Sequence, residues 1–125
     1  MRKKVHDVDV LIKGGHYSHV VVAGGFLFVS GIVSIDLENQ LRITDDIKAA
    51  TELALINVKK ALESAGSNLD KVVKVTVFLR DAVDFNSMNE VYSTFFPKEP
   101  PARACVVVKE IPGDFPLEIE VIAIK

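Results

Sequence analysis

The sequence predicts an α+β protein in which two helices pack on one face of a mixed, mostly antiparallel sheet. Five stretches rich in β-branched residues have the length and alternation of strands, and two longer segments repeat apolar residues at helical spacing. The elements follow the order strand, strand, helix, strand, helix, strand, strand, which is typical of this class. With 125 residues, the chain has the size of a single domain over residues 1–125.

The first two predicted strands, at residues 19–23 and 26–35, flank a pair of glycines that readily adopts the positive φ angles of a tight hairpin turn. An earlier short strand fits residues 8–12. The polar residues 36–42 are predicted to form a loop. We therefore expect the chain to begin with a hairpin of the sheet.

The first predicted helix begins near residues 44–46, where Thr44 or Asp45 can cap free amide groups, and Gly66 ends it. Its buried stripe consists of Ile47, Ala50, Ala54, Val58, Ala61, Leu62 and Ala65. The second predicted helix spans residues 84–96 and is stopped by Pro97. Its inward residues are Phe85, Met88, Val91, Tyr92 and Phe95.

Three further strands are predicted at residues 72–80, 102–108 and 117–124. One face of the first of these is formed by Val73, Val75, Val77 and Leu79. Several strands are apolar on both faces, whereas two helices can cover only one side of the sheet. The other apolar side predicts a closed homo-oligomer that packs sheet faces together, the alternative being a monomer whose loops cover that side.

Charge and cysteine content narrow the function classes. A formal net charge of −2 argues against stable nucleic-acid binding, because phosphate contacts need clustered Lys and Arg, although brief contact with RNA stays open. Cys105 is the single cysteine, so an internal disulfide and a zinc or iron–sulfur site are excluded, which indicates a reducing compartment.

The N-terminal residues lack the apolar core of a secretory signal, and no segment suits a membrane-spanning helix. We expect a soluble, cytoplasmic protein.

Arg103 is the strongest candidate for ligand binding. It follows two prolines at the mouth of an apolar strand, where strand alternation places it on one face together with Cys105. Its planar fork matches a carboxylate with two parallel hydrogen bonds, which suits a small acidic ligand. An internal salt bridge to Asp or Glu is an equally good interpretation from spacing alone.

Glu118 and Glu120 share one face of the last strand, and paired carboxylates can divide acid and base roles when their environments differ. For Glu120 a solvated strand face is the plainer interpretation. Ser30-Gly31 interrupts an apolar strand with a small polar residue and a glycine, a break of pattern that often marks close ligand approach.

The remaining polar candidates carry weaker signals. Tyr17 offers a hydroxyl just before a strand, whereas Asn89 on the second helix is more simply solvated. His16 and His19 have no third ligand in sight, so a metal role is not favoured. Cys105 could act as a nucleophile only if a base or a positive neighbour lowered its pKa, and a buried packing cysteine is the commoner case.

Seven segments carry a family resemblance. They are Gly15-His16-Tyr17-Ser18, Leu27-Phe28-Val29-Ser30-Gly31, Val72-Val73-Lys74-Val75-Thr76-Val77-Phe78-Leu79, Asp84-Phe85, Asn89-Glu90-Val91-Tyr92, Pro101-Ala102-Arg103-Ala104-Cys105-Val106 and Leu117-Glu118-Ile119-Glu120-Val121-Ile122-Ala123. The last two, at this separation, are the most specific. Over almost its whole length the chain resembles the RidA/YjgF family of reactive intermediate deaminases, also called the L-PSP endoribonuclease family.

The resemblance implies a chorismate-mutase-like homotrimer, with a central barrel of sheets, outer helices and ligand clefts between subunits. It implies that enamines and imines released by pyridoxal-phosphate enzymes, such as 2-iminobutanoate and 2-iminopropanoate, are hydrolysed to 2-keto acids and ammonia without a metal or organic cofactor. The expected partners are therefore a small 2-imino or 2-keto acid and two further copies of the chain.

The resemblance also implies residue roles. Arg103 would bind the substrate carboxylate, and Glu118 would orient or deprotonate the attacking water. Backbone groups around Cys105 and Gly31 would position the imine nitrogen and that water. The cleft would be shaped by Tyr17, Ser30 and Asn89.

Three features depart from the family pattern. His16 stands where proline is common, Ile32-Val33-Ser34 replaces Gln-Ile-Pro, and the loop before Pro100 is short. These departures leave the carboxylate-binding residue intact and bear on substrate size and rate. The alternatives to imine hydrolysis are cleavage of single-stranded RNA and a non-catalytic, ligand-binding regulatory trimer.

Overall fold

The computed structural model describes residues 2–125 and confirms an α+β fold with two helices and a mixed sheet. The main sheet contains β1 (Lys4–His6), β2 (Val20–Ala23), β3 (Phe26–Ile32), β6 (Val72–Leu79), β7 (Ala102–Val107) and β8 (Leu117–Ile124). A separate hairpin is formed by β4 (Ile35–Asp36) and β5 (Leu41–Arg42). The helices are α1 (Ile47–Ser64) and α2 (Phe85–Phe95), with 3-10 turns η1 (Leu69–Lys71) and η2 (Ala82–Asp84).

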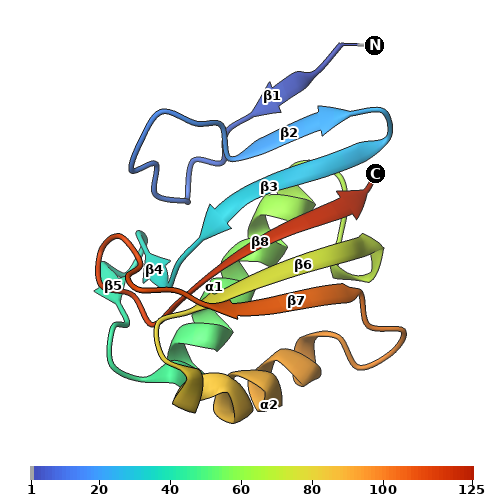
Figure 1. The fold of residues 1–125 in the computed structure, drawn as a ribbon. Helices are drawn as coiled ribbons and strands as arrows, with labels where there is room; N and C mark the ends of the chain where they lie inside the picture. Colours follow the sequence, from blue (N-terminus) through green and yellow to red (C-terminus); the bar gives the residue numbers. More distant parts are fainter. Residues whose placement is uncertain (1) are drawn as a thin grey trace.

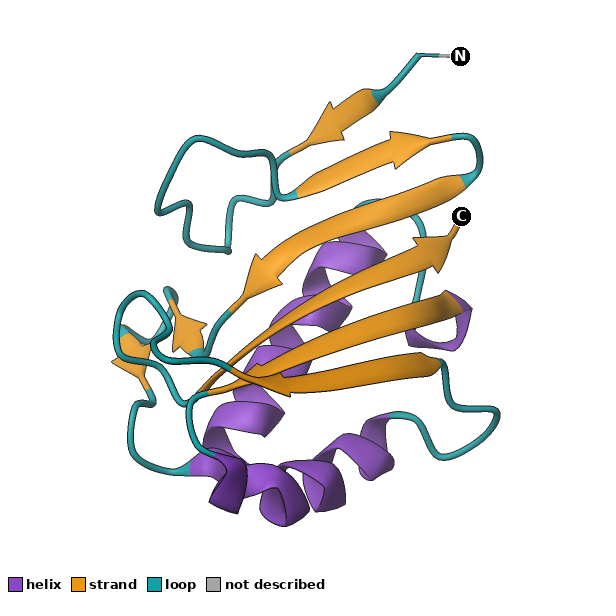
Figure 2. Ribbon diagram, viewed as in Figure 1, coloured by secondary structure: helices purple, strands orange, loops and turns teal. Residues whose placement is uncertain are grey.

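The strands of the main sheet are arranged in the order β1-β2-β3-β8-β6-β7. All neighbours are antiparallel except β6 and β7, which are parallel and are connected through α2. Both helices lie on the same side of the sheet, with α1 crossing behind β3 and β8 (Figures 1 and 2). The core fills the space between, where Leu27, Val75 and Ile119 are completely buried.

The opposite face of the sheet is open and apolar, as the sequence predicts. Phe28 is 45% exposed there, and its cross-strand partner on β8 is Ile122. Phe26, Val106 and Ile124 are also exposed on this side. No loop among residues 2–125 covers these side chains, so within the described chain they lie against solvent.

The N-cap of helix α1 is Asp46, one residue after Asp45 and two after Thr44, the two predicted caps. Asp46, with an extended backbone (φ −129°, ψ 102°), accepts a hydrogen bond from the amide of Ala49, so the prediction of Thr44 or Asp45 is wrong. The helix ends as predicted, since Gly66 follows its last turn with a φ of 84°. None of the helices in residues 2–125 is long and apolar enough to cross a bilayer.

Three predictions within residues 8–42 are wrong. Residues 8–12 form a loop instead of a strand, because Val8 and Leu11 turn inward and join the core, and the edge strand is β1. The strand predicted at 26–35 ends at Ile32, where its register with β8 shifts, and the predicted loop at 36–42 contains the β4–β5 hairpin.

Strict alternation also fails at one end of β6. The register with β8 shifts between Val72 and Lys74, so Val72 is buried and Val73 is 40% exposed instead of facing the core. In α2, Met88 and Tyr92 are buried as predicted, whereas Phe85 at its first turn is 39% exposed. This exposure leaves the Phe85 ring beside the edge strand β7.

Candidate active site

The sheet register separates the predicted site residues into two groups on opposite faces. On β7, Arg103 and Cys105 pair with completely buried residues of β6 and therefore point to the helix side. On β8, Glu118 pairs with Phe78 and points to the open side. Within one chain, the Arg103 guanidinium and the Glu118 carboxyl therefore lie on opposite faces of the sheet.

Arg103 is held by α2 without an acidic partner. Its Nη1 donates a hydrogen bond of 2.8 Å to Oδ1 of Asn89, and its guanidinium carbon lies 4.6 Å from the ring centroid of Tyr92 and 5.6 Å from that of Phe85. Among residues 2–125 it makes no ion pair with Asp or Glu. The salt-bridge interpretation of Arg103 is thus wrong, and so is the expectation that Asn89 is merely solvated. The charge remains available to a ligand.

Cys105 is a poor candidate for a thiolate. Burial raises the pKa of its thiol above the ordinary value, and the opposing effect of the Arg103 charge is smaller. Its side chain packs against the core. The family resemblance implies a role for the backbone around this residue, which does not depend on a thiolate. Burial likewise raises the pKa of Tyr92, whose buried hydroxyl has no hydrogen-bond partner among residues 2–125.

On the open side, a cavity of about 630 Å³ collects the other predicted residues. Tyr17, Ser30, Gly31 and Glu118 all line it. A Cβ atom added to Gly31 would collide with Oε2 of Glu118 and would stand 2.8 Å from its Cδ. The glycine in the interrupted strand is therefore what lets the carboxyl lie against β3, which gives the break of pattern a physical meaning.

The environment of Glu118 raises the pKa of its carboxyl above the ordinary value, so the protonated form is favoured relative to a carboxyl in water. Burial is the main cause of its raised pKa, and the negative charge of Glu120 adds to the effect. Glu120 itself is exposed, in agreement with the plainer interpretation. A half-buried carboxyl with a raised pKa can exchange a proton closer to neutral pH than an ordinary one, which suits general acid–base chemistry.

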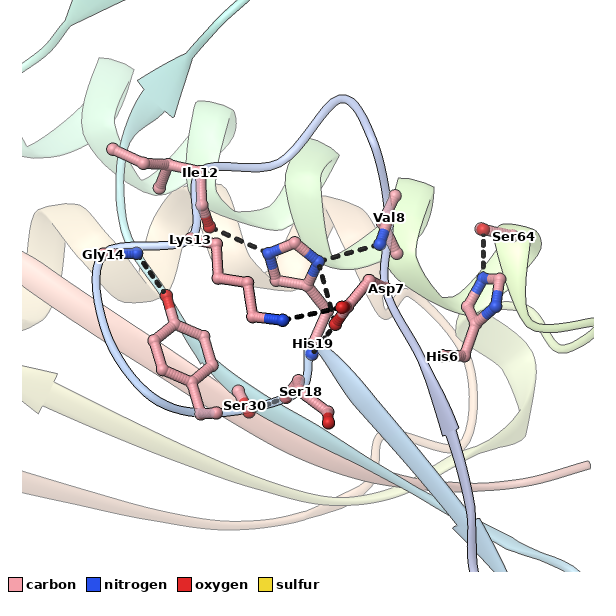
Figure 3. Close-up of polar contacts among 11 residues, drawn as sticks. His6, Asp7, Val8, Ile12, Lys13, Gly14, Ser18, His19, Ser30 and Ser64 are labelled. Carbon is pink, nitrogen blue, oxygen red and sulfur yellow. Dashed lines mark hydrogen bonds and ion pairs between the residues drawn. The ribbon is translucent and has the colours of Figure 1, made fainter.

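The loop before β2 is organised around a buried histidine (Figure 3). His19 is 6% exposed; its Nδ1 accepts a 2.8 Å hydrogen bond from the amide of Val8, and its Nε2 donates a 2.9 Å bond to the carbonyl of Ile12. In the same loop, the amide of Gly14 donates to the Tyr17 hydroxyl. With both ring nitrogens occupied, His19 holds the loop that carries Tyr17. Among residues 2–125, no cluster of three His, Cys, Asp or Glu side chains is placed to hold a metal ion.

Three polar side chains, the half-buried Ser30 and the buried Ser34 and Asn57, fix the neighbouring backbone. The Ser30 hydroxyl donates a 2.6 Å hydrogen bond to the carbonyl of Ser18 and so ties β3 to the Tyr17 loop. The Ser34 hydroxyl donates to the carbonyl of Ile43, and the Asn57 amide donates to the carbonyl of Ile35. Sequence reasoning missed Asn57, which also lines the cavity; a polar residue within an apolar helical stripe was the available signal.

Comparisons with known proteins show which proteins this chain is similar to. The sequence model of the family Endoribonuclease L-PSP matches residues 11–125. A RutC family protein of Pyrococcus abyssi is 46% identical over 111 residues, which cover 89% of this chain and 87% of that protein. Crystal structures of RidA from an Antarctic Psychrobacter species and of E. coli TdcF with bound serine each have a TM-score of 0.91 and 33% identity. The match covers 98% of this chain and 99% of RidA, and 98% of both chains for TdcF. The family model over residues 11–125 and these relatives show that this chain belongs to the L-PSP, or RidA/YjgF, family.

Proposed function

We propose that this chain is a 2-iminobutanoate/2-iminopropanoate deaminase that hydrolyses reactive enamine and imine intermediates to 2-keto acids and ammonia. The observation that carries the proposal is the Arg103 guanidinium, held by a neutral amide and an aromatic ring and without an acidic partner among residues 2–125. Such a group matches the carboxylate of a small 2-imino acid. Support also comes from the E. coli TdcF structure, which contains serine, a small molecule with a carboxylate.

The working unit in this proposal is a homotrimer with the chorismate-mutase-like arrangement of sheets around a central barrel. Phe26, Phe28 and Ile124 are exposed on a face that neither helix covers, and packing against other copies would remove this apolar surface from water. A closed assembly would also bring Arg103 of one protomer to the Glu118 cavity of another. The back-to-back placement of these two groups supports a site between subunits.

In the proposed mechanism, Arg103 binds the substrate carboxylate through two parallel hydrogen bonds and fixes the C=N carbon in the cleft. Backbone groups around Cys105 and Gly31 position the imine nitrogen and a water molecule, while Tyr17, Ser30 and Asn89 shape the cleft. Water adds to the carbon, and Glu118 takes a proton from the water and returns it to nitrogen. The hydroxyl group of the resulting carbinolamine then passes its proton to nitrogen, the carbon–nitrogen bond breaks, the carbonyl forms, and ammonia leaves.

A coupled assay with a threonine dehydratase tests the proposal. The dehydratase releases the imine, semicarbazide traps what remains, and the chain should accelerate imine loss. Arg103→Ala should abolish the acceleration, whereas Lys59→Ala, which removes an exposed cation on α1, should not change it. An unchanged rate in Arg103→Ala would show that the assigned role is wrong.

The same preparations separate the alternatives. Cleavage of single-stranded RNA by the purified protein, lost in Arg103→Ala, would favour an endoribonuclease, although the net charge of −2 speaks against a surface for RNA. Tight binding of a 2-keto acid without turnover of any imine would favour a regulatory ligand-binding trimer.

A further inference from the structure

One arginine other than Arg103 lines the Glu118 cavity and has no role in the proposed mechanism. Arg42 lies on β5, in the small hairpin beside the main sheet. Its Nη2 donates a 2.7 Å hydrogen bond to the carbonyl of Gly113, and its guanidinium carbon lies 4.5 Å from the ring centroid of Phe115. Among the described residues that line the cavity, it is the one arginine or lysine.

Arg42 is held in the same manner as Arg103. Each guanidinium donates one hydrogen bond to an uncharged oxygen and lies over an aromatic ring, at 4.5 Å for Arg42 and 4.6 Å for Arg103. Neither makes an ion pair within residues 2–125, whereas Arg80 pairs with Asp114 at 3.0 Å. A guanidinium that is held in place, with four further N–H donors and no carboxylate partner, can bind an anion.

The turn beneath Arg42 is shaped to hold it. Gly113 has a φ of 88°, and a Cβ atom at this position would stand 2.5 Å from Cε2 of Phe115 and 3.5 Å from Nη2 of Arg42. Phe115 is 3% exposed, so its ring is a rigid support for the guanidinium. A side chain at Gly113 would displace the Phe115 ring, over which the guanidinium lies, so the position of Arg42 depends on this turn as well as on its own hairpin.

The charges of the cavity indicate which ligands would need Arg42. Glu118 and Glu120 line it and would repel a second negative group on a substrate. A monocarboxylic imino acid places its one charge on Arg103 and requires no other cation. A substrate with an acidic side chain does require one, and Arg42 lines the same cavity as Glu118.

We infer that Arg42 binds the side-chain carboxylate of dicarboxylic 2-imino acids and that such imines are a substrate class of this protein. The inference rests on the proposed function, because Arg103 still binds the first carboxylate. The chemistry is the same hydrolysis: water supplies the carbonyl oxygen, its two hydrogens go to nitrogen, and the products are a 2-keto dicarboxylic acid and ammonia. No oxidant or reductant takes part.

The test compares two imines made in place by amino acid oxidases, 2-iminoglutarate and 2-iminobutanoate. Semicarbazide trapping gives kcat/KM for each. We expect wild-type protein to accept the dicarboxylic imine, and Arg42→Gln to lose about tenfold or more of kcat/KM for it while keeping that for 2-iminobutanoate. The glutamine can still donate to the Gly113 carbonyl, and thermal unfolding of the variant checks the hairpin.

Controls separate this inference from the proposed function. Lys59→Ala removes one positive charge away from the cavity and should leave both values unchanged. If wild-type protein hydrolyses 2-iminobutanoate alone, or if Arg42→Gln affects both imines equally, the inference is overturned and the deaminase proposal stands. If neither imine is hydrolysed, both are overturned.

Discussion

Gly31 on β3 lies so close to Glu118 on β8 that a single added Cβ atom would stand 2.8 Å from the carboxyl carbon and 3.1 Å from Cγ. The two strands are neighbours, and the register between them shifts in this region. The position of the candidate proton-transfer group is therefore set by the absence of a side chain on the adjacent strand.

Replacing Gly31 with alanine should impair activity much more than folding. The atoms that the new methyl group meets belong to the end of the flexible Glu118 side chain, which can move aside at small cost to stability. Imine hydrolysis should fall by about tenfold or more, since a carboxyl displaced by about 1 Å loses its alignment with water. The assay is kcat of the coupled reaction together with a thermal melt. Gly14→Ala is the matched control, because a Cβ there meets nothing within 4 Å.

Changing Asn89 to aspartate should neutralise Arg103 without moving it. The new carboxylate would take the place of the amide oxygen, which now lies 2.8 Å from Nη1, and would compete with the substrate for the guanidinium. We expect KM for 2-iminobutanoate to rise about tenfold while kcat changes less. Asn86→Asp adds the same charge to an exposed position of α2. An equal effect of the two substitutions would mean that net charge, and not the Arg103 contact, is responsible.

The raised pKa of Glu118 makes the stability of the protein depend on pH. Because the folded state binds this proton more tightly than the unfolded chain, the carboxyl adds stability below its ordinary pKa, and the gain is lost as pH rises through the raised pKa. Glu118→Gln should therefore become more stable relative to wild type as pH increases across that interval. Urea unfolding at a series of pH values measures the difference. Glu52→Gln, exposed on α1, should show no such trend.

Two inactive variants should complement each other when their subunits are mixed. In Arg103→Ala the Glu118 cavity is intact, and in Glu118→Gln the Arg103 side is intact, so a mixed trimer can contain one complete site between two different chains. Random exchange at equal amounts should restore about one quarter of the wild-type sites. Mixing either variant with the double variant should restore nothing. Failure of the first mixture to regain activity would place the whole site within one protomer.

Local patterns were sufficient to predict most elements and one half of the site. Strand β8 was predicted with its observed bounds, and the ends of α2 agree within one residue, because strand alternation and helical spacing depend on neighbours in the sequence. The same alternation placed Arg103 and Cys105 on one face of their strand, which the register with β6 confirms.

The remaining features depend on contacts between distant segments. Arg103 and Glu118 lie on opposite faces because β6 pairs with both of their strands, an arrangement that no local pattern specifies. The exposure of Val73 follows from a register shift against β8, and the inward turn of Val8 follows from the bonds around His19. These details are set when the sheet assembles, so the sequence around each residue contains no direct signal for them.

Because β6 pairs with both β7 and β8, Arg103 and Glu118 of one chain lie on opposite faces of the same sheet. Under the proposed mechanism, the arginine that binds the carboxylate and the glutamate that transfers the proton therefore cannot act on one substrate within a single chain. Under this mechanism, a newly synthesised monomer is inactive until it assembles with other copies, and dissociation on dilution would abolish the activity reversibly. Keeping the monomer inactive in this way requires neither a propeptide nor a covalent modification, since the geometry of the sheet is sufficient.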